Sequence, residues 1–137
     1  MQRTLAIIKP DAYEKKVAGK IISRIIEEGF EIRGMRLVHL SKRDAEGLYQ
    51  VHKERPFFGQ LIDFMSSGPA VILALEGADA IARWRELIGP TNPADAPEGT
   101  IRKLYATNVE RNAVHGSDSP ASADEEISFF FSGLDLV

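Results

Sequence analysis

The chain has 137 residues and no cysteine, which excludes a disulfide framework and a thiolate metal site. Hydrophobic residues make up 44% and charged residues 27%, as in ordinary globular proteins, and this length predicts a single domain over residues 1–137. The formal net charge of −3 argues against a protein built mainly to bind nucleic acid, because such proteins are usually basic.

The first strand and the first helix follow from the spacing of apolar residues. Residues 3–8 are rich in β-branched residues and end before Pro10, which predicts a buried strand. Residues 18–28 predict a helix, because isoleucines recur there at three- and four-residue spacing. Gly29 is a natural C-terminal stop for that helix.

A second strand and a helical hairpin are predicted next. Residues 30–40 predict a strand whose apolar positions change parity near Gly34, which is where a β-bulge would lie. Either Ser41 or Asp44 begins the helix that follows. After a break, residues 58–66 predict a second short helix, and the two helices should form a hairpin on the surface.

The second half of the chain predicts two more strands and two more helices. Residues 70–75 predict a third strand, and residues 79–88 predict a helix with one apolar face. The loop 89–99 contains three prolines and is long for a compact domain, so function is expected there. A short strand around 112–115 and a helix from 120 to about 130 complete the domain.

The order of these elements predicts the fold class. Strand, helix, strand, helical hairpin, strand, helix, strand and helix is an order typical of an α+β sandwich of the ferredoxin-like type. We therefore expect a mostly antiparallel four-stranded sheet with helices packed on it.

The segment 112–119, Asn-Ala-Val-His-Gly-Ser-Asp-Ser, carries the strongest chemical signal. Gly-Ser-Asp-Ser is typical of a turn and a helix cap, which accounts for the residues after His115 but not for the histidine. A neutral imidazole can accept a phosphoryl group when one ring nitrogen is free and a partner fixes the other. Glu126 could be that partner. On spacing alone, His115 could also be a polar residue at a strand end, and Glu126 a solvent-facing carboxylate.

The chain lacks the glycine-rich loops that usually bind phosphate. It contains neither the Walker A sequence nor the glycine-rich loop of protein kinases. A phosphate-transfer enzyme without them must supply charge from side chains. Arg85, Arg102 and Lys9 could do so, with Thr91 as a neutral donor, and arginine suits phosphate because its planar fork makes paired hydrogen bonds. Each could also be an ordinary surface residue unless the fold brings them together.

Four motifs together give a specific resemblance. Residues 3–12 include Lys-Pro-Asp, residues 52–58 read His-Lys-Glu-Arg-Pro-Phe-Phe, and residues 89–102 include Gly-Pro-Thr-Asn-Pro-Ala and Gly-Thr-Ile-Arg. With the segment 112–119, they occur in the order of the nucleoside diphosphate kinase family. The chain resembles this family from end to end, and the resemblance implies transfer of a terminal phosphate between nucleotides through a phosphorylated histidine, which maintains the pools of nucleoside triphosphates.

The resemblance implies a set of catalytic residues. His115 would accept the phosphate, while Glu126 and Ser117 would orient and polarise its ring. Tyr49 would support the pocket beside Lys9, which lies near the transferring phosphate.

The resemblance also implies a set of nucleotide-binding residues, which are Lys9, Phe57, Arg85, Thr91, Arg102 and Asn112. Arg85, Thr91 and Arg102 would hold the phosphates, and Lys9 and Asn112 would contact the sugar. Phe57 would stack on the base, with His52 and Arg55 lining the phosphate side of the cleft. Mg²⁺ would enter with ATP or another nucleotide, bridging phosphate oxygens, so no protein cage for the metal is expected.

One segment departs from the family pattern. Many members follow Gly-Thr-Ile-Arg with Gly-Asp-Phe, whereas Lys103, Leu104 and Tyr105 stand here. The phosphate-binding arginine is kept as Arg102, but no role can be carried over for an aspartate after it.

The resemblance implies a homo-oligomer built from dimers, either a tetramer or a hexamer, and we expect Pro93 to help join subunits. No apolar run approaches the roughly 18 residues needed to cross a bilayer, and residues 5–8 are too short for a signal peptide. We therefore expect a cytoplasmic protein with no membrane partner.

Two other readings belong to different functional classes. A non-catalytic nucleotide-binding module on the same fold would need the arginines but not the pair of His115 and Glu126. A nucleic-acid binder would need a basic stripe, which the sequence does not show.

Overall fold

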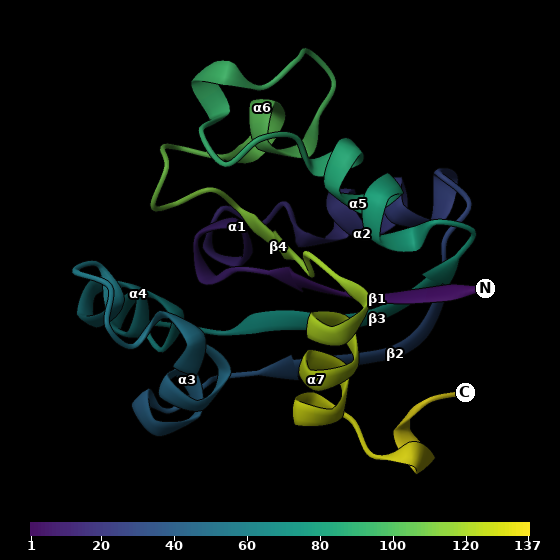
Figure 1. The fold of residues 1–137 in the computed structure, drawn as a ribbon. Helices are drawn as coiled ribbons and strands as arrows, with labels where there is room; N and C mark the ends of the chain where they lie inside the picture. Colours follow the sequence, from purple (N-terminus) through teal and green to yellow (C-terminus); the bar gives the residue numbers. More distant parts are fainter.

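Four strands form one antiparallel sheet in the order β2-β3-β1-β4 in the computed structural model, which describes residues 1–137. The strands are β1 (Gln2–Ile8), β2 (Glu31–Val38), β3 (Ala70–Gly77) and β4 (Val114–Gly116). Because β1 lies between β3 and the short β4, the sheet brings the first and last strands of the chain together (Figure 1). This α+β arrangement is the ferredoxin-like fold predicted from the order of elements.

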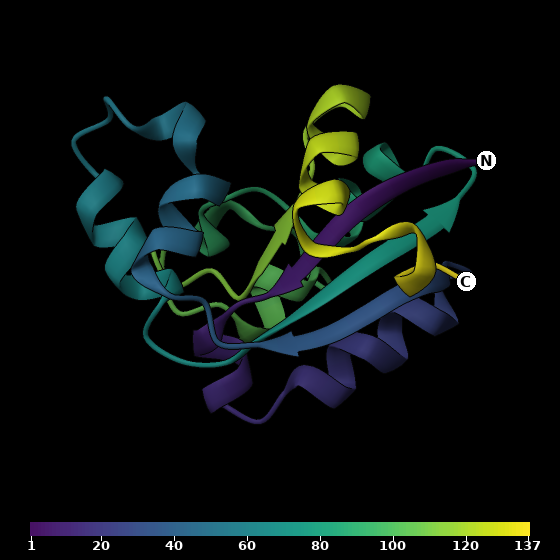
Figure 2. The ribbon, with the colours of Figure 1, turned by 90° about the horizontal axis from the view of Figure 1, so that it is seen from below.

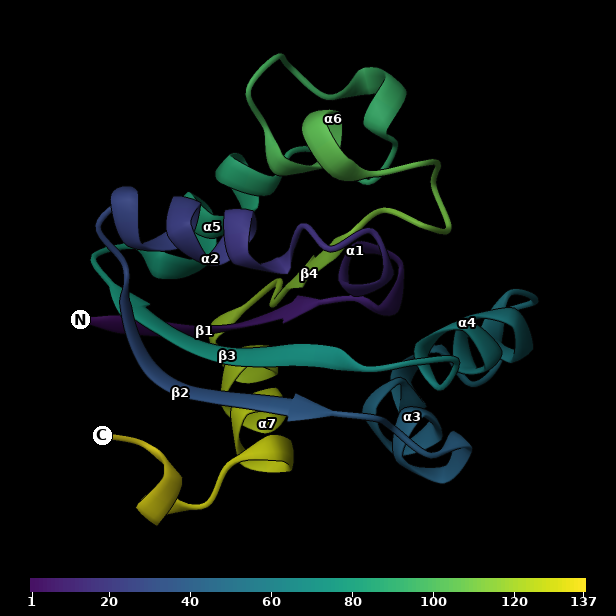
Figure 3. The same ribbon diagram turned by 180° about the vertical axis from the view of Figure 1, so that it is seen from behind.

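Helices cover both faces of the sheet. The α-helices are α1 (Pro10–Glu14), α2 (Ala18–Glu27), α3 (Lys42–Leu48), α4 (Phe58–Met65), α5 (Ala80–Ile88), α6 (Ile101–Tyr105) and α7 (Pro120–Phe130). Figure 2 shows α7 on one face and α2 on the other. Figure 3 shows α3 and α4 side by side at one end of the sheet, which is the predicted helical hairpin.

Two hydrophobic cores follow from the alternation of side chains along the strands. Leu5 and Ile7 of β1 pack with the apolar residues of α3, α4 and α7, whereas Ala6 and Ile8 pack with those of α1, α2, α5 and α6. The central strand β3 contributes to both cores in the same alternating way. Both faces of the two central strands, β1 and β3, are therefore buried. Lys9 directly follows the buried C-terminal end of β1.

The predicted bulge in β2 is confirmed. The register with β3 shifts between Ile32 and Gly34, so Arg33 is the extra residue. A Cβ at Gly34 would lie 3.0 Å from the ring of Phe131, which explains why a glycine stands beside the bulge. Ser41 begins α3 as its N-cap, and Asp44 completes a reciprocal capping box three residues later.

Two short helices and one boundary were not predicted. The helices α1 and α6 have 5 residues each, too few to show a helical period. The last strand begins at Val114, not at residue 112, because Ala113 takes a positive φ of 73° that ends the extended conformation.

The long helices and the first three strands match the predicted ranges within two residues. The differences of two residues are at the end of β2, which ends at Val38 and not at 40, and at the end of β3, which ends at Gly77 and not at 75. Three short 3₁₀ helices, Gln50–His52, Pro93–Asp95 and Gly133–Asp135, complete the elements. None of the helices combines the length and the apolar character that a membrane span requires.

Candidate active site

A cleft of about 1150 Å³ contains almost all of the predicted site residues. Its lining includes Lys9, Tyr49, His52, Phe57, Arg85, Thr91, Arg102, Asn112, His115 and Glu126. Ser117 is fully buried behind this lining, where it contacts Glu126. Arg55 is exposed and lies outside the lining, so its predicted place beside the phosphates is not seen. Residues far apart in the sequence thus converge on one space.

The position of His115 is set by β4. This strand pairs with β1, so that Ile7 and His115 are partners across the ladder. Trp84 of α5 donates from its indole Nε1 to the carbonyl oxygen of His115 at 3.0 Å. A Cβ at Gly116 would lie 2.6 Å from the Trp84 ring, which is why only glycine fits after the histidine. The strand is therefore clamped between β1 and α5.

A strained turn precedes the strand. Ala113 has a φ of 73°, and the N–H of Val114 donates to the carbonyl oxygen of Asn112 at 2.9 Å. A left-handed conformation costs a residue with a side chain about 1–2 kcal/mol. The turn points the Asn112 side chain toward Lys9, whose ammonium group donates to Asn112 Oδ1 at 2.9 Å.

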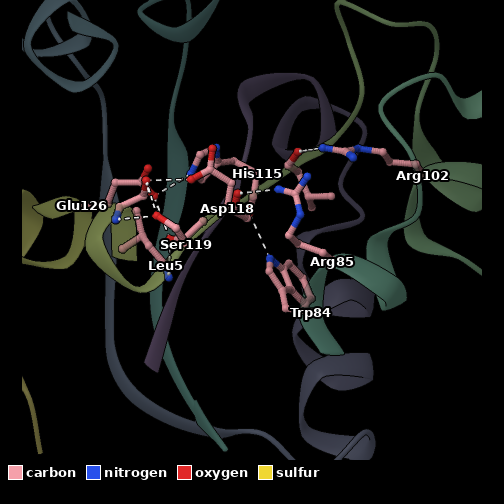
Figure 4. Close-up of polar contacts among 12 residues, drawn as sticks. Leu5, Trp84, Arg85, Arg102, His115, Asp118, Ser119 and Glu126 are labelled. Carbon is pink, nitrogen blue, oxygen red and sulfur yellow. Dashed lines mark hydrogen bonds and ion pairs between the residues drawn. The ribbon is translucent and has the colours of Figure 1, made fainter. Parts of the chain in front are cut away.

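The two ring nitrogens of His115 have different surroundings. Nε2 lies 2.8 Å from Oε1 of Glu126, and Nδ1 makes no hydrogen bond to the protein. The hydroxyl of Ser117 also donates to Glu126 Oε1, at 2.8 Å, and accepts from the N–H of Leu5 at 3.1 Å. In Figure 4, Glu126 points toward His115, and Leu5 of β1 lies beside them.

The directions of these bonds select a tautomer. The backbone N–H of Leu5 can only donate, so the Ser117 hydroxyl must direct its proton at the carboxylate. A carboxylate that accepts from both partners places the ring proton of His115 on Nε2. The lone pair of Nδ1 is then free, which is what a nucleophilic imidazole requires.

Tyr49 contributes a buried hydroxyl. Its oxygen has no hydrogen-bond partner, and its ring meets the ring of His115 edge-on, with 6.5 Å between centroids. Burial, and then the negative charge of Glu126, raise the pKa of Tyr49 far above its ordinary value. The hydroxyl therefore stays protonated and can donate to a ligand in the cleft.

Cationic side chains line the side of the cleft opposite Glu126. Arg102 donates to the carbonyl oxygens of Gly89 at 2.8 Å and Val114 at 2.9 Å, and burial followed by the charge of Arg85 lowers its pKa to about 10. Burial first, and the charge of Arg102 second, lower the pKa of Lys9 to about 8, while Asp11 raises it. These groups are positive at neutral pH and crowd one another, so an anionic ligand would relieve their repulsion.

The outer part of the cleft is aromatic and exposed. Phe57 is 46% exposed, and its ring lies 5.7 Å from that of His52 between centroids. Further along α4, the centroid of the Phe64 ring lies 5.3 Å from the guanidinium of Arg111. An exposed aromatic surface at the mouth suits a flat, apolar ligand group.

Several lining residues were missed by the sequence reasoning, among them Arg111, Phe64, Asp118, Ser122, Glu125 and Phe129. Asp118 accepts from the hydroxyl of Ser122 at 2.7 Å, and this bond, followed by the charge of Arg85, lowers the pKa of Asp118. Asp118 and Ser119 were interpreted only as turn and helix-cap residues, so the place of Asp118 in the lining was not predicted. The closeness of Asp118 to His115 in the sequence is the one signal that could have indicated it.

No group of three or more histidine, aspartate or glutamate side chains is arranged to hold a metal ion. The cleft offers cations and neutral donors next to a few separate carboxylates. Such a lining fits a metal that is held by phosphate oxygens of a ligand and by water.

A ferredoxin-like domain that gathers cations suited to phosphate around a free imidazole nitrogen fits the class of phosphotransferases. Comparison with known proteins gives the family within this class. The family model described as nucleoside diphosphate kinase matches residues 2–136, and the chain belongs to that family. It is therefore an enzyme of the nucleoside diphosphate kinase type.

Close relatives and solved structures agree with this assignment. Nucleoside diphosphate kinases of Geotalea daltonii and Geotalea uraniireducens are each 59% identical over 137 residues, which is 100% of both chains. The crystal structure of the Aquifex aeolicus nucleoside diphosphate kinase is 50% identical, with a TM-score of 0.98 and 99% of each chain covered. The halophilic enzyme of Halobacterium salinarum, solved in complex with CDP, is 35% identical, with a TM-score of 0.96, and covers 99% of this chain and 91% of its own.

Proposed function

We propose that the enzyme works through a phosphohistidine at Nδ1 of His115 and thereby interconverts nucleoside di- and triphosphates. The observation that carries the proposal is the 2.8 Å contact from Nε2 to Glu126, which leaves Nδ1 as the free nitrogen. One cleft holds both the cations suited to phosphate and the free Nδ1 of His115, which favours two half-reactions at one site.

In the first half-reaction, the Nδ1 lone pair of His115 attacks the terminal phosphorus of a nucleoside triphosphate. The bond from that phosphorus to the bridging oxygen breaks, and the diphosphate leaves. In the second half-reaction, a terminal oxygen of another diphosphate attacks the phosphorus, and the N–P bond breaks. The proton on Nε2 stays between the ring and Glu126 throughout, where it stabilises the positive character of the phosphorylated ring.

The lining supports a specific orientation of the nucleotide. Arg85, Thr91 and Arg102 hold the phosphates on the cationic side. Lys9 and Asn112 bind the sugar, and Lys9 also faces the transferring phosphate. The CDP complex of the Halobacterium salinarum relative supports the binding of a nucleoside diphosphate in such a cleft.

Two groups lie at the ends of the bound nucleotide. Phe57 stacks on the base at the mouth. The hydroxyl of Tyr49, buried and without a partner, donates to the phosphate near His115. Stabilisation of charge that develops on the moving phosphoryl group is the main task of such groups.

Mg²⁺ completes the proposal as the cofactor. It neutralises charge on the phosphates of ATP and other nucleotides when it is bound with them. Lys9 and Arg102 then supply the remaining positive charge from the protein. The reaction maintains the balance of nucleoside triphosphates, and we expect it in the cytoplasm, where these are made and used.

We further propose a homo-oligomer built from dimers. Met35 and Leu37 on the edge strand β2 are 56% and 61% exposed, and Ile26 on the neighbouring α2 is 59% exposed. Such neighbouring apolar side chains beside an unpaired strand edge favour burial against a second copy. Pro93, in the stiff loop after α5, is expected to join such dimers into a tetramer or a hexamer.

Incubation with labelled ATP and Mg²⁺ tests the mechanism. We expect an acid-labile, base-stable phosphoprotein and parallel initial-rate lines when one nucleotide is varied at several levels of the other. A non-catalytic nucleotide-binding module would give no phosphoprotein. Intersecting lines would mean direct transfer in a ternary complex.

A further inference from the structure

Asp11 makes a contact that the proposed chemistry does not use. It lies in α1, is only 4% exposed and does not line the cleft. Its Oδ2 accepts a hydrogen bond from the backbone N–H of Ala113 at 3.0 Å. Its Oδ1 is buried without a partner. Burying a carboxylate with so few hydrogen bonds destabilises the folded state, so a role of Asp11 elsewhere in the structure would explain its presence.

Ala113 is held on both sides by the same short segment. Its N–H is bound by the carboxylate of Asp11, and its carbonyl oxygen accepts from the N–H of Lys9 at 2.8 Å. Ala113 is also the residue with the positive φ, which its methyl side chain disfavours. The segment from Lys9 to Asp11 therefore supplies the interactions that keep this residue in its strained conformation.

The flanking carbonyls have a different partner. Arg102 donates to the carbonyl oxygens of Asn112 at 3.3 Å and Val114 at 2.9 Å. In the proposed function, the N–H groups of Arg102 that do not bind carbonyl oxygens donate to the phosphates. Asp11 lies outside the cleft, so its bond to Ala113 does not depend on whether a nucleotide is bound.

The turn decides where two site residues lie. Asn112 immediately precedes Ala113 and meets Lys9, while His115 follows two residues later in β4. If Ala113 relaxed to a negative φ, the chain on either side would change direction, and both side chains would move. A displacement of about 1 Å at a reacting group can slow a reaction about a hundredfold.

We propose that Asp11 is a positioning residue for phosphoryl transfer, whose carboxylate holds the strained turn at Ala113 and so fixes His115 relative to Asn112 and Lys9. The inference rests on the proposed function, because it assigns the purpose of the turn to the histidine. It makes no claim that Asp11 contacts a nucleotide.

Single-turnover phosphorylation by ATP and Mg²⁺, at about pH 6.5 so that Lys9 stays charged, provides the test. We expect Asp11→Ala to slow phosphohistidine formation about tenfold or more, and to weaken ADP binding by a smaller factor, because Arg85, Thr91 and Arg102 still hold the phosphates in the proposed function. Ala113→Gly removes the steric cost of the positive φ. We therefore expect the double variant Asp11→Ala, Ala113→Gly to recover to within about threefold of Ala113→Gly alone.

Two further variants separate the hydrogen bond from charge and from general stability. Asp11→Asn keeps an acceptor oxygen and should retain at least about a third of the rate. Asp135→Ala is the matched control, because it removes a carboxylate that accepts from the backbone N–H of Ser132 at 2.8 Å, away from the cleft. Its rate should equal that of the wild type. Should Asp11→Ala fail to fold, Asp11→Ser, which is too short to reach the amide, takes its place.

The proposal is overturned if Asp11→Ala phosphorylates at the wild-type rate, if Ala113→Gly brings no recovery, or if Asp11→Asn loses as much as Asp11→Ala. Hydrogen exchange of the Ala113 amide separates this outcome from failure of the proposed function. Exchange should be faster in Asp11→Ala and unchanged in Asp11→Asn. A wild type that forms no phosphohistidine contradicts the proposed function, while the exchange rates still test the hold of Asp11 on the turn.

Discussion

Glu126 binds one ring nitrogen of His115 and leaves the other free. The contact joins Nε2 to Oε1 at 2.8 Å, and the same oxygen receives the hydroxyl proton of Ser117. One carboxylate oxygen therefore fixes both the orientation of the ring and its tautomer. In the proposed mechanism, the reactivity of His115 therefore depends on a residue that does not touch the phosphate.

The first prediction concerns this carboxylate. Glu126→Gln keeps one acceptor oxygen but loses the charge that stabilises the ring as it gains positive character. We expect phosphoryl transfer to slow by roughly ten- to a thousandfold, or about 1.4 to 4 kcal/mol. Asp124→Asn, an exposed substitution on the same helix outside the cleft, is the control and should leave the rate unchanged. Stopped-flow phosphorylation rates measure both, and equal rates for the two variants would contradict the role of Glu126.

The second prediction concerns pH. Burial lowers the pKa of Lys9 to about 8, so its ammonium group is present below that pH and is lost as the pH rises through it. If the charge faces the transferring phosphate, kcat/KM for a diphosphate should fall above about pH 8. Lys9→Arg should move that fall to higher pH. A profile that stays flat to pH 9.5 in the wild type would mean that Lys9 does not act through its charge.

The third prediction concerns base specificity. Phe57 offers an aromatic face at the mouth of the cleft, and every base has a π-face on which it can stack. We therefore expect purine and pyrimidine nucleotides, ribo and deoxy alike, to be used with similar kcat/KM. A preference above about a hundredfold, near 2.7 kcal/mol, for one base would require a hydrogen-bonding group that reads the base edge.

The fourth prediction concerns assembly. Met35→Glu and Leu37→Glu place charge on the exposed apolar edge of β2, and together they should convert the oligomer to smaller species. Leu134→Glu, at an exposed position in the C-terminal segment, is the control. The mass in solution at micromolar concentration measures the effect. A wild-type protein that is monomeric there would contradict the proposed assembly.

Most of the sheet and the longer helices could be predicted because their apolar residues are periodic. The helix α7 (Pro120–Phe130) was predicted with its observed bounds, since Ser119 and Pro120 mark its beginning. The short helices α1 and α6 were missed, because 5 residues show no period. The strand ending at Gly116 was placed too early, since nothing in the sequence reveals the positive φ of Ala113.

The site was predictable to a different extent. The motif around His115 and the resemblance it carries indicated the residues that the structure gathers in one cleft. Their individual roles stay predictions. The choice of ring nitrogen and the contact from Asp11 to Ala113 could not be predicted, because both depend on how distant segments meet, which leaves no spacing signal in the sequence.

The most direct test of the central claim compares phosphoprotein yield and ADP affinity in His115→Ala. The substitution removes the proposed nucleophile but leaves Arg85, Arg102 and Thr91 to bind phosphate. We therefore expect no phosphohistidine and no transfer, with ADP binding retained. If the variant is still phosphorylated on histidine and turns over normally, the nucleophile is His39 or His52, and the assignment of His115 is wrong.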